Sequence, residues 1–253
     1  MNLKIVTFNV KIDSPEGFSR RLTYISRKIR EVMPDIICFQ EMNHRMLILA
    51  VQALPEYSIV GGGREYNRLG EGTMIAFNKS RFILGNCRTK WLSPTPDVPG
   101  SRYTEDQSGC PRVYTTVTLT EVEEGTTFRI YNTHLDHRGK IARLQGERLL
   151  MADIRCDLAE LTVPLMLTGD FNADPESAEI REICESGIIR DVTDEYTLTF
   201  NNYGKPYHEW DASKIDYIFV SNDVKCNKTE LWDETPNGEY MSDHFAIYAE
   251  LEI

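Results

Sequence analysis

Apolar residues recur in two distinct periods along this chain. In eight segments of six to ten residues, they either alternate with polar residues or run almost continuously, as they do in β-strands. Alternation indicates a sheet with one covered face, and a continuous apolar run indicates a strand buried on both faces. The segments span residues 3–10, 35–40, 73–78, 113–120, 127–135, 163–169, 214–221 and 244–253.

A helical period separates several of these segments. Steps of four, three, four and three residues predict a first helix on Phe18, Leu22, Ile25, Ile29 and Val32. Ser14 is a suitable N-cap for it, with Pro15 in the first turn. The same rule predicts a long helix over about residues 139–161, marked by Ile141, Leu144, Met151, Ile154, Leu158 and Leu161. Asp174-Pro175-Glu176 opens a further short helix.

Strands that alternate with helices predict an α/β protein. A chain of 253 residues can bury a sizeable core, as one large domain or two small ones, and it shows no repeat, low-complexity tract or linker. No apolar stretch approaches the ~18 residues of a membrane span. The start, "MNLKIVTFNV", has one lysine and a short mixed run, which indicates a first strand rather than a signal peptide.

Cysteine usage and charge narrow the class of protein. The six cysteines include no CxxC pair, which predicts reduced thiols and favours a cytoplasmic location. The formal net charge is −11. Because non-specific nucleic-acid binding depends on Lys and Arg, this balance argues against indiscriminate binding of DNA, although an acidic protein can still carry a basic groove.

Polar residues gather at the ends of the predicted strands. They are Asn9, Glu41, Glu71, His134, Asp170, Asn172, Asp216, Asp243 and His244. If these ends converge, four or five carboxylates and two imidazoles share one basin. Crowded carboxylates need a cation, and oxygen donors without a thiolate select Mg²⁺ or Mn²⁺. Because Mg²⁺ often completes its shell with substrate phosphate oxygens, the pattern favours phosphate chemistry.

Taken singly, most of these residues have a simpler explanation. Asp170 is compatible with a turn former, and Glu41 with the first-turn acid of a following helix. His134 is compatible with a hydrogen-bonded strand-end histidine. Asp216 is different, since it lies inside an apolar run and an unpaired buried carboxylate costs several kcal/mol. We therefore expect Asp216 to be paired, with His244 as its partner.

Residues 86–112 form a long segment rich in Pro, Gly and polar groups. A connection of this length inside a compact domain is usually functional or disordered. Because it contains Trp91, Arg102, Tyr103 and Arg112, it is a candidate wall of the substrate site. A flexible insertion is an equally good interpretation.

Six sequence blocks together resemble one known group of proteins. "TFNV", "CFQE", "NTHLD", "TGDFN", "IDYIFVS" and "SDHFAI", in this order, resemble the endonuclease/exonuclease/phosphatase superfamily, from Asn9 to His244. That group includes pancreatic deoxyribonuclease, exonuclease III-type abasic endonucleases, deadenylases, neutral sphingomyelinases and inositol polyphosphate phosphatases. The resemblance implies a four-layer α/β sandwich: two face-to-face mixed β-sheets flanked by helices, in a single domain over residues 1–253.

The resemblance also implies a metal site and a group that activates water. Glu41 matches the metal-binding glutamate, with Asn9 beside it, and Asp243 matches a second acid near the metal. Asp170 matches the aspartate that orients or deprotonates the attacking water. Asn172 matches its companion, which binds phosphate or the metal shell.

Phosphate recognition is implied for a second set of residues. His244 matches the histidine that contacts the scissile phosphate, with Asp216 holding its ring. His134 matches the second histidine of deoxyribonuclease-like members, and Glu71 the carboxylate behind that histidine. Arg112 resembles a phosphate-binding arginine.

Lys11 departs from the pattern of the abasic endonucleases, which carry an aspartate at this position of the first block. A cation here weakens the case for that subgroup and for a second metal bound at this point. Lys11 is instead a candidate contact of a substrate phosphate.

These features predict a Mg²⁺-dependent hydrolase of phosphoric esters, with Mn²⁺ as an alternative ion, acting by in-line attack of water on phosphorus. A small-molecule phosphodiesterase or phosphatase is favoured by the acidic charge and by the segment 86–112. A DNA or RNA nuclease is favoured by the two histidines. A catalytically silent binding module is a third possibility, and no protein partner is implied.

Overall fold

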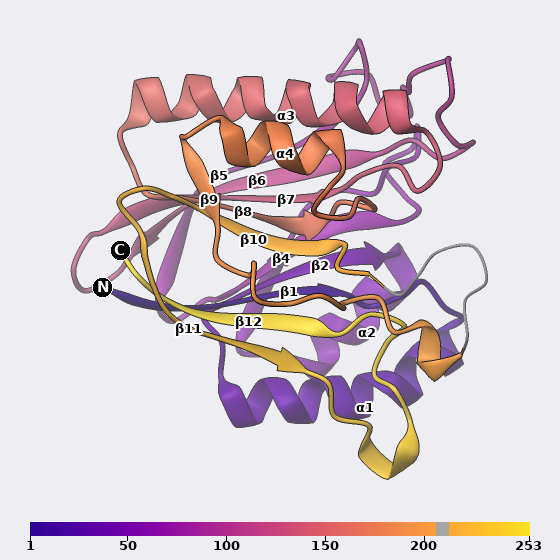
Figure 1. Ribbon diagram of the computed structural model, residues 1–253. Coiled ribbons are helices and arrows are strands. Elements are labelled where there is room, and N and C mark those ends of the chain that lie inside the picture. Colours follow the sequence, from indigo (N-terminus) through magenta and orange to yellow (C-terminus); the bar gives the residue numbers. More distant parts are fainter. Residues whose placement is uncertain (206–212) are drawn as a thin grey trace.

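Two mixed six-stranded sheets pack face to face in a computed structural model that describes residues 1–205 and 213–253 (Figure 1). Sheet A contains β1 (Asn2–Asn9), β2 (Ile36–Met42), β3 (Tyr57–Val60), β4 (Gly72–Asn78), β11 (Lys225–Trp232) and β12 (Ala246–Glu252). Its strand order is β11-β12-β1-β2-β4-β3. Only β1 and β2 are parallel neighbours in this sheet, among the described strands.

Sheet B is built in the same mixed manner from the middle of the chain. It contains β5 (Phe82–Trp91), β6 (Val113–Glu121), β7 (Thr127–His134), β8 (Leu165–Asp170), β9 (Ile189–Asp191) and β10 (Asp216–Ser221). The strand order is β5-β6-β7-β8-β10-β9, and β7 and β8 are parallel.

Helices cover the outer faces of both sheets. Figure 1 shows α1 (Pro15–Val32) and α2 (His44–Ala53) on sheet A, and α3 (Lys140–Leu161) and α4 (Ala178–Glu185) on sheet B. Short 3₁₀ turns follow at η1 (Asn202–Gly204) and η2 (Pro236–Gly238). As expected from the sequence, Ser14 caps α1 by accepting a hydrogen bond from the Gly17 N–H. These layers confirm the predicted four-layer sandwich.

Three apolar cores hold the layers together. The core between the sheets includes Ile5, Cys38, Ile130 and Ile218. A second core lies between sheet A and α1 with α2, and a third between sheet B and α3 with α4. Each fully buried aliphatic side chain contributes roughly 1.5–3 kcal/mol. The central strands serve two cores at once, which explains their continuous apolar runs.

The strands that the sequence did not reveal all lie at sheet edges. β3 and β11 are the outer strands of sheet A, and β5 and β9 those of sheet B. β3 and β9 are short, and β5 and β11 are partly exposed and rich in polar residues, so none shows the apolar pattern of a buried strand. Residues 86–91 belong to β5, so this part of the segment 86–112 is not a loop. On the long helix, Met151 and Ile154 are buried while the two terminal positions, Ile141 and Leu161, are exposed.

Buried amides link the two sheets near one end of the sandwich. Gln40 Nε2 on β2 lies 2.7 Å from Asn132 Oδ1 on β7. The Asn132 amide in turn donates to the carbonyl groups of Phe39 and Met74 at 2.9 and 3.0 Å. These buried hydrogen bonds between β2, β4 and β7 fix how the sheets align. The N- and C-termini lie together at the opposite end (Figure 1), where the Met1 amino group donates to the Ile253 carbonyl.

Within the described part of the chain, no helix combines the length and apolarity that crossing a bilayer requires.

Candidate active site

Strand pairing brings three of the predicted residues into one row on sheet B. His134, the last residue of β7, is the register partner of Asp170, the last residue of β8. Asp170 is also the register partner of Asp216, the first residue of β10. Because paired strands lie about 4.8 Å apart, backbone hydrogen bonding alone sets these three residues side by side.

Sheet A supplies the opposite side of the site. Asn9 ends β1 beside Gln40, so Glu41 follows directly on the neighbouring strand β2. His244 lies two residues before the start of β12, which pairs with β1 on the other side. The Asn9 amide donates to Asp170 Oδ2 at 2.8 Å and thereby joins the two rows across the sandwich.

Asp170 lies at the centre of this arrangement and is 1% exposed. Its Oδ2 lies 3.4 Å from His134 Nε2 and 3.8 Å from His244 Nε2. Burial raises the pKa of Asp170 to about 7, and the nearby His244 offsets this only in part. The Asn172 N–H donates to Oδ1 at 2.9 Å, so Asp170 also shapes the turn that follows β8.

Asn172 and Gly169 hold the ends of β7 and β8 in place. The Asn172 side-chain amide donates to the Leu135 carbonyl at 3.1 Å, so it supports the end of β7. Gly169 has a φ of +151°, and a Cβ there would collide with the Thr133 carbonyl oxygen. Glycine therefore allows the close approach of β8 to β7 just before Asp170.

His244 and Asp216 form the pair that the sequence predicted. His244 Nδ1 lies 2.9 Å from Asp216 Oδ2. Burial alone would lower the pKa of His244, but the Asp216 carboxylate outweighs it and raises that pKa to about 10. Thr199 Oγ1 donates to the same Asp216 oxygen at 2.6 Å. No sequence pattern pointed to Thr199, which lies in a loop before the isolated bridge between Phe200 and His244.

Glu41 faces the same centre from sheet A. It lies within β2 and has a φ of 61°, at a point where the register with β4 shifts. Its Oε1 accepts from Asn9 Nδ2 at 3.2 Å, and its Oε2 accepts from the Ile12 N–H at 2.8 Å. Helix α2 begins only at His44, which excludes the interpretation of Glu41 as a first-turn acid.

Charges around Glu41 keep it ionised. Burial favours the neutral acid, but Lys11 and the Ile12 N–H outweigh it and hold the pKa of Glu41 below its ordinary value. Lys11 Nζ lies 3.9 Å from Glu41 Oε2 and 3.5 Å from Asp243 Oδ2. Burial lowers the pKa of Lys11, yet these two carboxylates raise it above the ordinary value. Asp243 is thus brought to the same basin.

Arg112 reaches the site from the end of the segment 86–112. Its guanidinium contacts His134 Nε2 at 3.0 Å and His137 Nδ1 at 2.7 Å. Asp136 Oδ2 lies 3.5 Å from Arg112 Nε. Burial and the Arg112 charge lower the pKa of His134 well below its ordinary value, so His134 is neutral. His137 was not predicted as a site residue.

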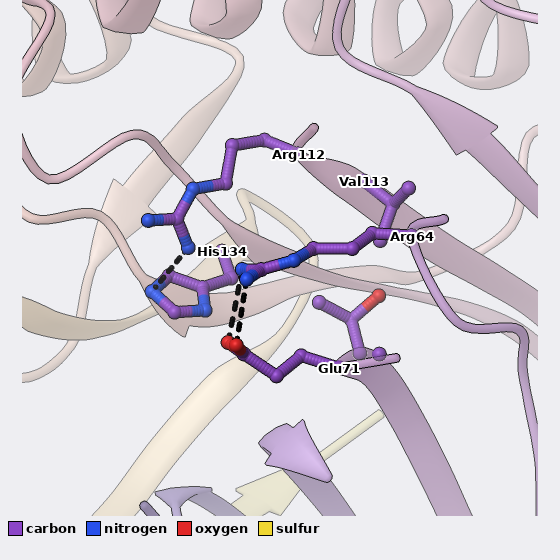
Figure 2. A pocket seen from close by; sticks show the side chains of 7 residues that line it. Arg64, Glu71, Arg112, Val113 and His134 are labelled. Carbon is purple, nitrogen blue, oxygen red and sulfur yellow. Dashed lines mark hydrogen bonds and ion pairs between the residues drawn. The ribbon is translucent and has the colours of Figure 1, made fainter. Parts of the chain in front are cut away.

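Arg64 is a second buried arginine that sequence reasoning missed. It forms a two-point ion pair with Glu71 at 2.6 and 2.9 Å, and the Trp91 indole donates to its carbonyl. Figure 2 shows this pair beside the ring of His134, with Arg112, the residue before β6, pointing to that ring. A small hollow of about 10 Å³, which is room for about one water molecule, lies here, lined by Arg64, Glu71, Gly72, Thr73, Arg112, Val113 and His134.

Glu71 therefore has a different partner from the one that the sequence suggested. Burial raises its pKa, and Arg64 offsets this in part. No hydrogen bond joins Glu71 to His134 among the described residues, although their ligand atoms and one from Glu41 lie within 4.8 Å of one another. The only sequence signal for Arg64 was its position after the glycine run 61–63.

The donor atoms fit a hard divalent cation. Glu41, Glu71 and His134 form one possible ligand group, and Asp170, Asp216 and His244 form another. Both consist of two carboxylates and an imidazole, without a thiolate in either group. Carboxylate oxygens suit Mg²⁺ or Mn²⁺, and the imidazole nitrogen also suits transition metals. In the second group, Asp216 Oδ2 is already paired with His244 Nδ1 at 2.9 Å.

This chain is similar to several solved structures and curated proteins. The endonuclease/exonuclease/phosphatase of Bacteroides vulgatus is 28% identical, with a TM-score of 0.90 over 100% of this chain and 99% of that chain. The mannosyl-6-phosphatase of Bacteroides thetaiotaomicron is 26% identical, with a TM-score of 0.87 over 99% and 100%. Nocturnin of Drosophila melanogaster is 23% identical over 93% of this chain.

The chain spans between 42% and 66% of the length of the curated relatives that it matches first. A sequence model of the Endonuclease/Exonuclease/phosphatase family matches residues 6–244, which is nearly the whole chain. Members of this family hydrolyse phosphate esters. With the four-layer sandwich and the basin at its end, this match establishes that the chain belongs to the Endonuclease/Exonuclease/phosphatase family.

Proposed function

We propose that this chain is a metal-dependent hydrolase of phosphoric esters that uses in-line attack of water on phosphorus. One observation carries the proposal: Asn9, His134 and His244 all approach Asp170 Oδ2, at 2.8, 3.4 and 3.8 Å. Asp170 is thus a buried carboxylate surrounded by an amide and two imidazoles, and Asn9 links it to Glu41. Such a carboxylate is suited to position an attacking water and to accept its proton.

Glu41 would hold the cation, together with Asn9 and the Glu71–His134 pair. The ion, when bound, supplies a positive charge that polarises a phosphate oxygen and stabilises the leaving oxyanion. Glu41 is ionised because its pKa is held below the ordinary value, which suits a ligand of a hard cation.

Asp170 would accept the proton of the attacking water, and His244 would neutralise negative charge on the phosphate. Asp170 has a pKa of about 7 because of burial, so it can accept a proton from water near neutral pH. His244 has a pKa of about 10 because of Asp216, so at neutral pH it presents a positive ring to the charge that grows on the phosphate oxygens.

On the opposite side of the site, the positive charge would come from Arg112 rather than from His134. His134 is neutral because burial and Arg112 lower its pKa. Its Nε2 can then accept a hydrogen bond from Arg112, so the same atom carries no proton for the Asp170 carboxylate that lies 3.4 Å away. The guanidinium of Arg112 has the fork geometry that binds phosphate oxygens in pairs.

A small phosphoric ester is the substrate class that we favour. The mannosyl-6-phosphatase resembles this chain over its full length at 26% identity. The net charge of −11 disfavours a long polyanion as substrate. The buried arginines Arg64 and Arg112 concentrate positive charge at a pocket rather than along a groove.

Nuclease activity is the second candidate. The observation in its favour is that both His134 and His244 lie within 4 Å of the Asp170 carboxylate, as the two-histidine pattern of the sequence suggested. The same residues could then serve a phosphodiester of DNA or RNA.

A substrate panel separates these possibilities. Sugar phosphates, p-nitrophenyl phosphate, bis-p-nitrophenyl phosphate, plasmid DNA and single-stranded RNA are each incubated with Mg²⁺ and with a chelator. We expect Mg²⁺-dependent release of phosphate from the monoesters. Asp170→Asn and His244→Ala should each reduce turnover about 10²–10⁴-fold while the circular dichroism spectrum stays unchanged.

Asp97→Asn is the matched control, since Asp97 is exposed and lies outside the site. It should leave turnover unchanged. Near-normal hydrolysis by Asp170→Asn would contradict the assignment, and cleavage of nucleic acid alone would favour the nuclease. Chelator-insensitive binding of a ligand without turnover would instead indicate a silent binding module.

A further inference from the structure

We propose that the ammonium group of Lys11 takes the place of a second divalent cation, so that this chain binds a single metal ion. The inference rests on the proposed metal-dependent function. Lys11 Nζ lies between two carboxylates, 3.5 Å from Asp243 Oδ2 and 3.9 Å from Glu41 Oε2. Both carboxylate side chains are almost buried, at 6% and 12% exposure, so they need a compensating charge.

The backbone around Lys11 is fixed by contacts to two other parts of the fold. Lys11 has a φ of 53°, a strained conformation for a residue with a side chain. Its N–H donates to Asn9 Oδ1 at 3.0 Å, and its carbonyl accepts from Arg21 at 2.8 Å. The buried Arg21 guanidinium also donates to the Met241 carbonyl at 2.9 Å. Arg21 therefore ties Lys11 to the segment that carries Asp243.

The two oxygens of Glu41 have different surroundings. Oε2 faces Lys11 and the Ile12 N–H, whereas Oε1 contacts the Asn9 amide, which also reaches Asp170. We assign Oε1 to the single ion and Oε2 to the ammonium.

Asp243 is also balanced without a metal ion. Its Oδ2 faces Lys11, and its Oδ1 lies 4.0 Å from His244 Nε2. A divalent ion placed between Glu41 and Asp243 would meet the Lys11 ammonium at short range, where like charges repel strongly in a partly buried site. The Lys11 ammonium thus supplies the positive charge that a second ion would provide between Glu41 and Asp243, and it excludes that ion.

Metal stoichiometry tests the proposal without relying on turnover. Metal-free protein is titrated with Mn²⁺ in a calorimeter, and electron paramagnetic resonance counts the free ion. We expect one equivalent of Mn²⁺ for the unmodified chain. Lys11→Met should tighten Mn²⁺ binding about tenfold or more, because it removes a neighbouring positive charge. Lys11→Asp should bind two equivalents, since it replaces the ammonium with a further carboxylate.

Two variants control for charge and for folding. Lys11→Arg keeps the cation and should retain one equivalent with an affinity close to that of the unmodified chain. Lys225→Met removes the same charge at the sheet edge, where Lys225 pairs with exposed Glu252, and should leave Mn²⁺ binding unchanged. Circular dichroism and thermal unfolding confirm that each variant is folded.

Several results would overturn the inference. Two equivalents in the unmodified chain, one equivalent in Lys11→Asp, or unchanged affinity in Lys11→Met would each show that Lys11 does not replace an ion. One tight ion with no effect of Lys11 would defeat this inference while leaving the proposed hydrolase intact. No Mn²⁺ binding by the unmodified chain would defeat both.

Discussion

His244 Nδ1 lies 2.9 Å from Asp216 Oδ2 at the buried end of the site. Thr199 binds the same oxygen, and the Asp216 N–H donates back to Thr199 Oγ1 at 3.1 Å. The carboxylate is thereby fixed in one orientation, and it fixes the tautomer and charge of the ring in turn. The other ring nitrogen of His244 is left facing Asp170.

Asp216→Asn should lower the pKa of His244 from about 10 towards its ordinary value, because the negative charge that raises it is lost. At neutral pH, turnover should fall about 10²-fold or more, since the ring is then mostly neutral. Titration of the ring signal by NMR gives the pKa directly. An unchanged His244 pKa would contradict the role of Asp216.

Stability should decline as the pH rises from about 6.5 to 10. The pKa of His244 is higher in the folded chain than its ordinary value. Protonation of its ring therefore stabilises the fold fully below about pH 6.5, and this stabilisation is lost as the pH rises through about 10. Asp170, whose pKa is raised to about 7, acts in the same direction at lower pH. Urea unfolding of metal-free protein measures this, and His244→Gln should flatten the upper part of the curve.

Arg64→Met should reduce the free energy of unfolding by about 3–5 kcal/mol, because it leaves Glu71 as a buried carboxylate without its cation. Adding Glu71→Gln to this variant should restore part of the loss. Arg148→Met is the matched control, since the Arg148–Glu182 pair has the same two-point geometry but is 58% and 39% exposed. Its loss should be much smaller, because solvent screens an exposed ion pair. Equal losses in both variants would refute the argument.

Gly169→Ala should lower turnover about 10²-fold, because a Cβ at this position collides with the Thr133 carbonyl and displaces Asp170 from His134. Stability should also fall, by about 1–3 kcal/mol. Gly85→Ala is the control, since Gly85 is also a strand glycine but a Cβ there meets only ordinary contacts. Comparable turnover in the two variants would show that the close approach of β7 and β8 is unimportant.

The sequence predicted those parts of the site that buried strands determine. Asp216 interrupts an apolar run, so its burial and its pairing with a histidine could be expected before the structure was known. Arg64, Thr199 and His137 could not, because each lies outside the strands and reaches the site only through tertiary packing. Arg64 changes the interpretation of Glu71, whose ion pair no local pattern indicates.

The edge strands show that sequence patterns miss part of the fold as well. β5 and β11 present polar residues at many positions because one side of each strand has no neighbour. Their hydrogen bonds to the adjacent strand hold them in place, and these bonds leave no hydrophobic pattern in the sequence. The central strands, which serve two cores, were correspondingly easy to locate.

The hydrogen bond from Asn9 to Asp170 joins the first strand of the chain to a strand of the other sheet. Neither half of the polypeptide, produced as a separate fragment, carries all the reacting groups. Recovery of turnover on mixing two fragments cut between residues 121 and 127 would therefore report on reassembly of both sheets, since each sheet takes strands from both fragments. In this architecture, turnover therefore depends directly on how accurately the N-terminal and C-terminal parts of the chain are aligned.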